Sequence, residues 1–367
     1  MAGLYIHIPF CASRCIYCGF YSTTLLDLRA RYVEALGKEM EMRGPGSEPI
    51  RTIYLGGGTP SQLTHDELQH LFTYINKVYG PCTTEQEITM ECNPDDVHPG
   101  MFAGLPVNRV SMGAQTFSDK RLQLLHRRHS ATEVKQAVDM LRKEGIKNIS
   151  IDLMFGFPNE TLDEWEKDIE AALALNVEHI SAYSLMYEEG TVLYKMLQEE
   201  KIEEIDENLS NKMYKVLTER LTSAGYEHYE ISNFARSGYR SRHNSSYWNG
   251  THYIGIGAAA HSYDGTHREW NIDNVRQYIE AIEAGHRPFD GETIDEDTHY
   301  NDLIVTALRT REGINLNQLS NRHRTFLMDA ANESLRRGLL AVDNHRLHLT
   351  ADGILVSNSI MCDLMMV

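Results

Sequence analysis

Short apolar runs alternate with stretches of helical period along the first two thirds of this 367-residue chain. Apolar runs separated by amphipathic segments, such as 161–176 and 208–225, predict βαβ units and a parallel sheet. Six or seven units of this kind predict an α/β fold, either a partial or complete TIM-type (β/α) barrel or, as the alternative, a doubly wound sheet. The predicted strands are 4–8, 52–55, 87–92, 108–113, 148–155, 179–185 and 226–231.

The chemically distinctive residues favour the barrel, because each group follows directly on a predicted strand. These groups are the cysteines at 11–18, the sequence GGGTP at 56–60, Glu91, Gln115 and Asp152. In α/β barrels the active site lies at the carboxyl ends of the strands. We therefore predict a single site at that end of the barrel.

A smaller second domain is predicted at the C-terminus. The segment 285–300 is rich in Gly, Pro and acidic residues, so we divide the chain into domains of 1–285 and 286–367. Helical patterns cover 298–311 and 316–338. The tail then predicts a hairpin followed by a helix, which resembles a winged helix.

Charge argues against a nucleic-acid partner. The chain carries 52 acidic and 35 basic residues, a net charge of −17, and no Lys/Arg block supplies a phosphate-neutralising surface. No apolar stretch reaches the ~20 residues of a membrane span, and the first residues lack the basic and apolar regions of a signal peptide. We therefore predict a cytoplasmic protein.

Three of the six cysteines lie within eight residues, at Cys11, Cys15 and Cys18. Three thiolates in one loop suit a [4Fe–4S] cluster whose fourth iron stays open to another ligand. A zinc ion usually takes four ligands and would need a further donor such as His7, whereas a redox disulfide would use only two of the three thiols. The other cysteines, which lack metal-binding spacing and are predicted to be ordinary thiols, are Cys82, Cys92 and Cys362.

This CxxxCxxC spacing after the first strand resembles that of radical S-adenosylmethionine (SAM) enzymes. The longer string YIHIPFCASRCIYCGF is similar to one branch of them, the oxygen-independent coproporphyrinogen III oxidases (HemN) and the HemW-type heme chaperones. The resemblance extends over essentially the whole chain. It implies a [4Fe–4S] cluster on Cys11, Cys15 and Cys18, with SAM bound to the open iron.

The resemblance also implies a set of SAM contacts. The GGGTP turn matches the loop that holds the methionine end of SAM, and glycines allow a ligand to approach the backbone closely. Arg127 has a rival in its neighbour Arg128. The implied contacts are Tyr5, Tyr17, Gly57, Gly58, Thr59, Glu91, Gln115, Arg127 and Asp152.

The string RHNSSYWNG at 242–250 matches the HNxxYW sequence of heme-binding members of the branch. Histidine is a common axial ligand of heme, and aromatic rings pack on a porphyrin face. The resemblance therefore implies His243 as the heme ligand, with Tyr247 and Trp248 beside it. The nearby competitors are His252 and His261.

Two functions follow from the resemblance. One is a heme chaperone that binds heme and a SAM-coordinated [4Fe–4S] cluster and delivers heme to respiratory hemoproteins. The alternative is a coproporphyrinogen III oxidase, which forms protoporphyrinogen IX by radical oxidative decarboxylation. A zinc-bound scaffold is a third option, disfavoured by the GGGTP turn and its partners.

Three features favour the chaperone. Phe20 stands where the oxidases have a further cysteine, only four residues precede Tyr5, and HNxxYW is present. We assign no catalytic residue, and the sequence leaves open whether SAM is cleaved or only held. The resemblance is compatible with a homodimer.

Overall fold

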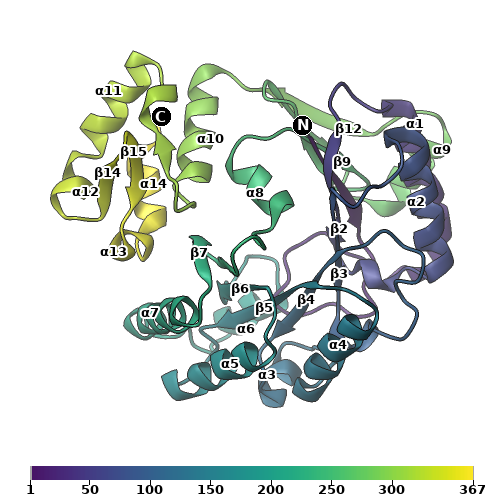
Figure 1. The fold of residues 1–367 in the computed structure, drawn as a ribbon, viewed down its shortest axis with the longest axis horizontal. Coiled ribbons are helices and arrows are strands. Elements are labelled where there is room, and N and C mark those ends of the chain that lie inside the picture. The colour runs from purple at the N-terminus through teal and green to yellow at the C-terminus, as the bar shows by residue number, and fades with distance from the viewer. Residues whose placement is uncertain (1, 367) are drawn as a thin grey trace.

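The computed structural model describes residues 2–366, in which six parallel strands lie side by side in chain order (Figure 1). Each strand pairs with the next in parallel register. A doubly wound sheet reverses its strand order at a switch point. That alternative is therefore wrong. The strands are β1 (Ala2–Ile8), β2 (Ile50–Gly57), β3 (Glu87–Cys92), β4 (Arg109–Gln115), β5 (Asn148–Phe155) and β6 (His179–Ser184).

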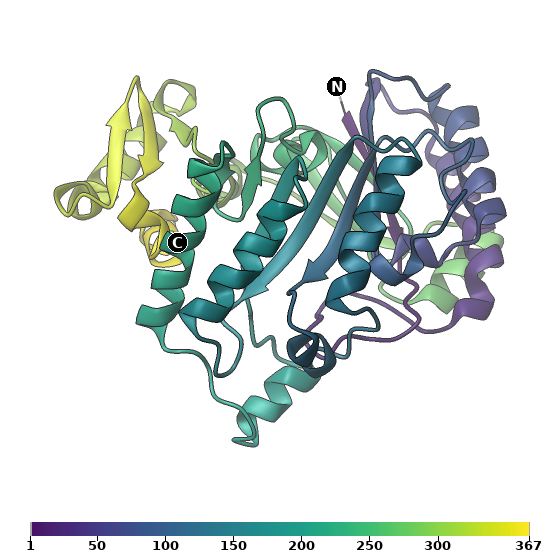
Figure 2. The same cartoon turned by 60° about the horizontal axis from the view of Figure 1, so that its bottom comes forward.

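Helices cover the outside of this curved sheet (Figures 1 and 2). The sequence specifies their starts by capping: Thr161 accepts from the Glu164 N–H, and the Glu164 carboxylate accepts from the Thr161 N–H. The predicted helices 161–176 and 208–225 correspond to α5 and α7. The helices that accompany these strands are α1 (Arg29–Arg43), α2 (His65–Tyr79), α3 (Asp119–Leu124), α4 (Ala131–Lys143), α5 (Leu162–Ala174), α6 (Val192–Gln198) and α7 (Glu207–Ser223), with single 3₁₀ turns η1 (Leu26–Leu28), η2 (Pro60–Gln62) and η3 (Pro94–Asp96). Helix α6 packs through Leu193 against Ile16 and not on the face of the sheet.

The barrel is partial, so the prediction of a partial barrel is confirmed and a complete one is wrong. Within residues 2–366 the sheet has two free edges, formed by short strands that extend it beyond β6 and beyond β1. Of these strands β9 runs parallel to β1, and the others pair antiparallel. The added elements are β7 (Glu227–Glu230), β8 (Asn233–Ala235), β9 (Tyr253–Ile256), β10 (His261–Tyr263), β11 (His267–Asn271) and β12 (Phe289–Thr293), with helices α8 (Arg242–Trp248) and α9 (Val275–Glu283).

The predicted strand 226–231 exists as β7, but it is not a further parallel strand of the barrel. It forms a hairpin with β8, to which Ile231 and Ser232 connect it. Two residues can join antiparallel strands, whereas a parallel pair needs a crossover of a dozen residues or more. The short connection therefore dictates the antiparallel pairing.

The two faces of the sheet differ in polarity because side chains alternate along each strand. Leu4, Ile6 and Ile8 of β1 are fully buried in the core beneath the helices. Tyr5 and His7 belong to the opposite face, which lines the inside of the barrel and is rich in polar groups. The interior of the barrel is thus suited to hold a polar ligand.

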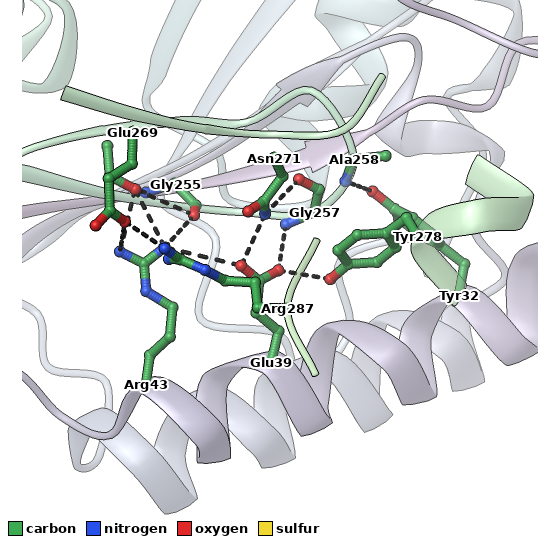
Figure 3. Close-up of polar contacts among 11 residues, drawn as sticks. Tyr32, Glu39, Arg43, Gly255, Gly257, Ala258, Glu269, Asn271, Tyr278 and Arg287 are labelled. Carbon is green, nitrogen blue, oxygen red and sulfur yellow. Dashed lines mark hydrogen bonds and ion pairs between the residues drawn. The ribbon is translucent and has the colours of Figure 1, made fainter. Parts of the chain in front are cut away.

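A buried carboxylate joins the β9–β11 extension to the barrel (Figure 3). Glu39 of α1 is fully buried and accepts hydrogen bonds from the Gly257 N–H at 2.8 Å, the Asn271 amide at 2.7 Å and the Tyr278 hydroxyl at 2.6 Å. Arg43 lies 3.7 Å from the same carboxylate. These groups come from α1, the β9–β10 turn, β11 and α9, so one side chain fastens four segments together.

The C-terminal region has its own core and sheet, with strand order β13–β15–β14. The predicted hairpin and following helix are present. The predicted boundary at 285 stays a prediction; the larger sheet continues to Thr293 of β12. No helix within residues 2–366 combines the length and apolarity that crossing a bilayer requires. The elements are α10 (Glu296–Ala307), β13 (Ile314–Asn315), η4 (Leu316–Gln318), α11 (Asn321–Ala330), α12 (Asn332–Arg336), β14 (Leu340–Asp343), β15 (Arg346–Leu349), α13 (Ala351–Ile354) and α14 (Ser357–Leu364).

Candidate metal centre

The cysteine loop follows β1 and is held at its base and at its middle. At the base, the Thr23 N–H donates to the Pro9 carbonyl at 2.7 Å and the Cys11 N–H donates to the Thr23 carbonyl at 2.9 Å. At the middle, Ile16 is buried in a small apolar core, and its backbone bonds to Leu125 and Leu193. These contacts order a loop that would otherwise be free to move.

The three thiols lie on this loop, all partly buried. Cys11 Sγ lies 3.4 Å from Thr59 Oγ1, and Cys15 Sγ lies 3.6 Å from Arg127 Nη1. Burial raises the pKa of both Cys11 and Cys18, and the neighbouring thiols raise it further. The three sulfurs are therefore close enough to interact electrostatically.

The residues present fit an iron–sulfur cluster in their chemistry. Among residues 2–366, no three His, Cys, Asp or Glu side chains already stand in metal-binding geometry. Three thiol donors share one loop, and a guanidinium lies beside one of them, where it can balance thiolate charge. Arg127 Nε is buried and has no hydrogen-bond partner in the described part of the chain, which leaves one donor for a bound ligand.

The GGGTP turn ends β2 next to the base of the cysteine loop. Gly57 has φ 110°, and a Cβ there would lie 2.5 Å from the His7 ring; a Cβ on Gly58 would lie 2.6 Å from the Pro9 carbonyl carbon. Packing against β1 thus requires glycine at both positions. Their N–H groups are already donated, Gly57 to Glu91 at 3.1 Å and Gly58 to the Ile8 carbonyl at 2.9 Å. A ligand here would be held chiefly by side chains.

Two carboxyl groups face the interior of the barrel below this turn. Glu91 accepts from the Tyr54 hydroxyl at 2.7 Å, and burial, reinforced by the Asp152 carboxylate, raises the pKa of Glu91 to about 7. Burial likewise raises the pKa of Asp152. Tyr5 stacks on Tyr54 with ring centroids 6.2 Å apart. Paired carboxylates of this kind can accept from hydroxyl and ammonium groups.

Arg127, not Arg128, belongs to the site. The Arg127 guanidinium donates to Asn93 Oδ1 at 2.8 Å and to the Gly113 carbonyl at 2.7 Å, in addition to its contact with Cys15. Arg128 instead forms ion pairs with the partly buried carboxylates of Asp95 at 2.8 Å and Asp96 at 2.7 Å. Consecutive residues thus have separate roles.

Gln115 and Tyr17 both lie near Arg127. Gln115 has φ 65° at the end of β4, where the pairing with β5 shifts register, and its amide lies beside Gly113 together with Arg127. Burial raises the pKa of Tyr17, and its charged neighbours are Arg127, Cys15 and Cys18. The structure therefore brings all nine predicted SAM-contact residues to one end and the interior of the barrel.

His243 occupies a different environment from the one expected of a heme ligand. It is fully buried at the start of α8, with Nδ1 2.8 Å from Thr52 Oγ1 and Nε2 2.9 Å from the Tyr247 hydroxyl. Its ring stacks on Tyr54 at 5.1 Å. Both ring nitrogens are used, so iron could reach His243 only after Tyr247 moves; the ligand role stays a prediction that this geometry does not favour.

Helix α8, which carries the HNxxYW string, lies between the barrel strands and α10 (Figure 1). Tyr247 contacts Tyr253 edge-on at 4.9 Å, and the Arg309 guanidinium lies 4.9 Å from the centre of the Trp248 ring. The string therefore closes the barrel interior and contacts the C-terminal region. Packing accounts for Tyr247, whereas the Trp248 Nε1–H is buried and has no hydrogen-bond partner among residues 2–366.

The two competing histidines differ from each other. His252 Nδ1 pairs with Glu48 at 2.6 Å. His261 is exposed on β10, and its ring makes no hydrogen bond to residues 2–366; its ring neighbour is Trp270, 6.0 Å away. Of the three candidate histidines, His261 alone within the described residues has a ring free of hydrogen bonds.

Sequence reasoning assigned no contact role to three residues beside the site: Tyr54, Asn93 and Arg109. Arg109 is 1% exposed, and its Nε and Nη1 have no partner among residues 2–366. Burial raises the pKa of Glu91 and of Asp152, and the charge of Arg109 opposes that rise. Burial lowers the pKa of His243, and the charge of Arg109 lowers it further. The sequence signal that could have revealed Tyr54 and Arg109 is a polar residue at alternate positions of an otherwise apolar strand.

Comparison with known proteins is consistent with this geometry. Residues 5–172 match the model of the Radical SAM superfamily, and residues 294–356 match that of the HemN C-terminal domain. The chain is 33% identical over 371 residues to a protein of Bacillus subtilis named heme chaperone HemW, covering 98% of both chains.

Two further similarities are to a mitochondrial protein and to a solved structure. The chain is 30% identical to radical S-adenosyl methionine domain-containing protein 1, mitochondrial, of Bos taurus, covering 99% of this chain and 87% of that one. Coproporphyrinogen III oxidase (HemN) from Escherichia coli superposes with a TM-score of 0.83 over 99% of this chain and 89% of that one. At 20% identity, this superposition shows a shared fold.

Proposed function

Because the chain belongs to the HemW family within the radical SAM superfamily, we propose that it is a heme chaperone. In this role it binds heme and carries a [4Fe–4S] cluster to which SAM is coordinated. The observation that carries the proposal is the match, over 98% of both chains, to a relative named heme chaperone. The exposed Phe20, 72% accessible at the end of the cysteine loop, supports it, since the oxidase pattern has a cysteine there.

Cys11, Cys15 and Cys18 would hold the cluster, and Arg127 would offset the negative charge of the thiolates. When bound, such a cluster supplies one-electron reduction. Glu91 and Asp152 would accept hydrogen bonds from the ribose hydroxyls and the ammonium group of SAM. The other proposed contacts are Tyr5, Tyr17, Gly57, Gly58, Thr59 and Gln115.

The recipients and the location are part of the same proposal. We take respiratory hemoproteins as the recipients and the cytoplasm as the compartment, both on the ground of family membership. A homodimer remains a prediction. Coproporphyrinogen III oxidation is the second candidate, supported by the fold shared with the Escherichia coli oxidase.

Titration with hemin, run beside an oxidase assay, separates these two functions. We expect the protein, with its cluster reconstituted under anaerobic conditions, to bind about one heme per chain with a shifted Soret band. It should leave coproporphyrinogen III unchanged when given SAM and a reductant, whereas an authentic oxidase run in parallel converts it. Turnover comparable to that of the oxidase would overturn the proposal, and so would an absence of heme binding.

Replacement of each of the two neighbouring arginines by methionine tests the SAM site. Arg127→Met should weaken SAM binding about 10- to 100-fold, because it removes the cation beside Cys15 and the buried donor. Arg128→Met is the matched control, since Arg128 pairs with Asp95 and Asp96 and not with a thiol of the cysteine loop. Equilibrium dialysis with labelled SAM measures both variants. Equal losses, or no loss in either, would contradict the assignment.

A further inference from the structure

The position of the heme site rests on the proposed heme-binding function. We propose that heme occupies the cavity at the ends of β10, β11 and β12, with the imidazole of His261 as its axial ligand. The position differs from that of His243, whose two ring nitrogens are hydrogen-bonded inside the barrel.

The cavity has the size and the lining that a porphyrin needs. Its volume is about 550 Å³, within the range of about 300–1,000 Å³ typical of cofactor sites. Aromatic and apolar groups form much of the lining, and the Phe289 side chain is 51% exposed there. An exposed aromatic ring at the mouth of a cavity is available to pack on a flat apolar ligand. The lining includes Ala259, His261, Trp270, Ile272, Pro288 and Phe289.

His261 is chemically ready to bind iron. It lies directly opposite Trp270 in the β10–β11 pair, with the two rings 6.0 Å apart and tilted by 31°. Neither ring nitrogen is hydrogen-bonded to residues 2–366. Although the residue is exposed, partial desolvation by the surrounding protein atoms and the nearby Arg268 lower the pKa of His261, and the neutral imidazole is the form that binds metals.

The wall of the cavity behind His261 is rigid. Ala259, which lines the cavity, has φ 60°, a conformation that costs energy in a residue with a Cβ. The network around Glu39 holds the turn in this shape, since the Gly257 N–H donates to Glu39 and the Ala258 N–H donates to Tyr32 (Figure 3). A preformed wall reduces the entropy lost when a ligand binds.

The cavity adjoins the segment that follows the cysteine loop. The Tyr21 hydroxyl accepts from the Val275 N–H at 2.6 Å, next to Asp273 in the cavity lining, and the Tyr21 carbonyl is 3.1 Å from His7 Nε2. Tyr21 lies three positions beyond Cys18. One residue therefore connects the proposed heme site to the candidate cluster loop.

Charge determines the orientation of the heme. Asp273 and Asp290 also line the cavity, and these carboxylates would repel the heme propionates. Heme should therefore enter with its vinyl-bearing edge inward and its propionates toward solvent. Replacing both residues, as in the double variant Asp273→Asn/Asp290→Asn, should leave heme affinity equal or higher.

The test is a cavity variant rescued by a free ligand. His261→Gly should weaken hemin binding about 10- to 100-fold and alter the Soret band, and added imidazole should restore the spectrum of the unmodified protein. Rescue also shows that the variant is folded. His267→Gly, at an exposed position of the adjacent strand β11, is the matched control and should bind as the unmodified protein does.

A ligand exchange gives a second readout. His261→Cys should convert the electron paramagnetic resonance spectrum of bound ferric heme to that of a thiolate complex, which a merely structural role of His261 would not produce. If the unmodified protein binds heme and both variants leave the spectrum unchanged, His261 is not the ligand, while the chaperone proposal stands. If the unmodified protein does not bind heme, the chaperone proposal itself fails.

Discussion

Replacing Cys11, Cys15 or Cys18 by alanine is expected to lower the iron content of the anaerobically reconstituted protein from about four per chain to background. Three thiolates leave no spare ligand in the loop, so each single loss removes one corner of the cluster. Apart from these three cysteines, residues 9–23 contain no cysteine, histidine, aspartate or glutamate that could take their place. Iron and sulfide analysis, together with the visible charge-transfer absorbance, measures the effect.

The chain provides its own controls for this experiment. Cys82 and Cys362 lie outside the site, partly buried and exposed respectively, so Cys82→Ala and Cys362→Ala should retain the full iron content. Far-UV circular dichroism should be unchanged in all five variants, because Ile16 and the Pro9–Thr23 hydrogen bond order the loop without metal. An intact cluster in any of the three loop variants, or zinc at full occupancy in the unmodified protein, would contradict the assignment.

Glu39→Gln is expected to lower the free energy of unfolding by about 2–4 kcal/mol. The three close partners of Glu39, the Gly257 N–H, the Asn271 amide and the Tyr278 hydroxyl, are all donors. A glutamine would place an NH₂ group against at least one of them, leaving buried donors without acceptors. Urea unfolding measures the change, and Glu41→Gln, an exposed position of the same helix that pairs with Lys77, should change it by less than about 0.5 kcal/mol.

The destabilisation caused by Glu39→Gln depends on pH with a definite sign. Burial raises the pKa of Glu39 above its ordinary value of 4.5, so the folded state binds the proton more tightly than the unfolded state. The contribution of Glu39 to stability is therefore largest at low pH and falls as the pH rises through the raised pKa. Because glutamine does not titrate, the difference in unfolding free energy between the unmodified protein and Glu39→Gln should narrow as the pH rises from below 4.5 through the raised pKa of Glu39. A difference that widens would contradict this account.

The parallel strands and the long helices were predictable because their signals are local. Period-2 and helical patterns are written in consecutive residues, and caps such as Thr161 and Asp206 mark where helices begin. The strands at 233–271 were missed. Each has three to five residues, too few for a periodic signal, and their order in the sheet depends on partners such as β1, some 250 positions earlier.

The candidate site likewise has parts that the sequence predicts and parts that it does not. The cysteines and the glycine turn were found from their spacing, because a loop of eight residues forces its thiols together in any fold. The choice between Arg127 and Arg128 could not be made from the sequence, since both have the same chemistry. Only the turn after α3 decides which guanidinium points to Cys15 and which to Asp95 and Asp96.

By itself, then, the sequence determined the three-thiol loop, the parallel βα core and the family, because all three depend on residues that are near one another or on motifs of fixed spacing. The tertiary structure decided which histidine is free. In the sequence the HNxxYW resemblance favours His243 over His261, but α8 carries His243 into the barrel, where Thr52 and Tyr247 occupy its nitrogens. The β10–β11 pair presents His261 to an open cavity beside Trp270. Burial and hydrogen bonding arise from contacts between distant segments, so the availability of a ring nitrogen is a property of the folded molecule.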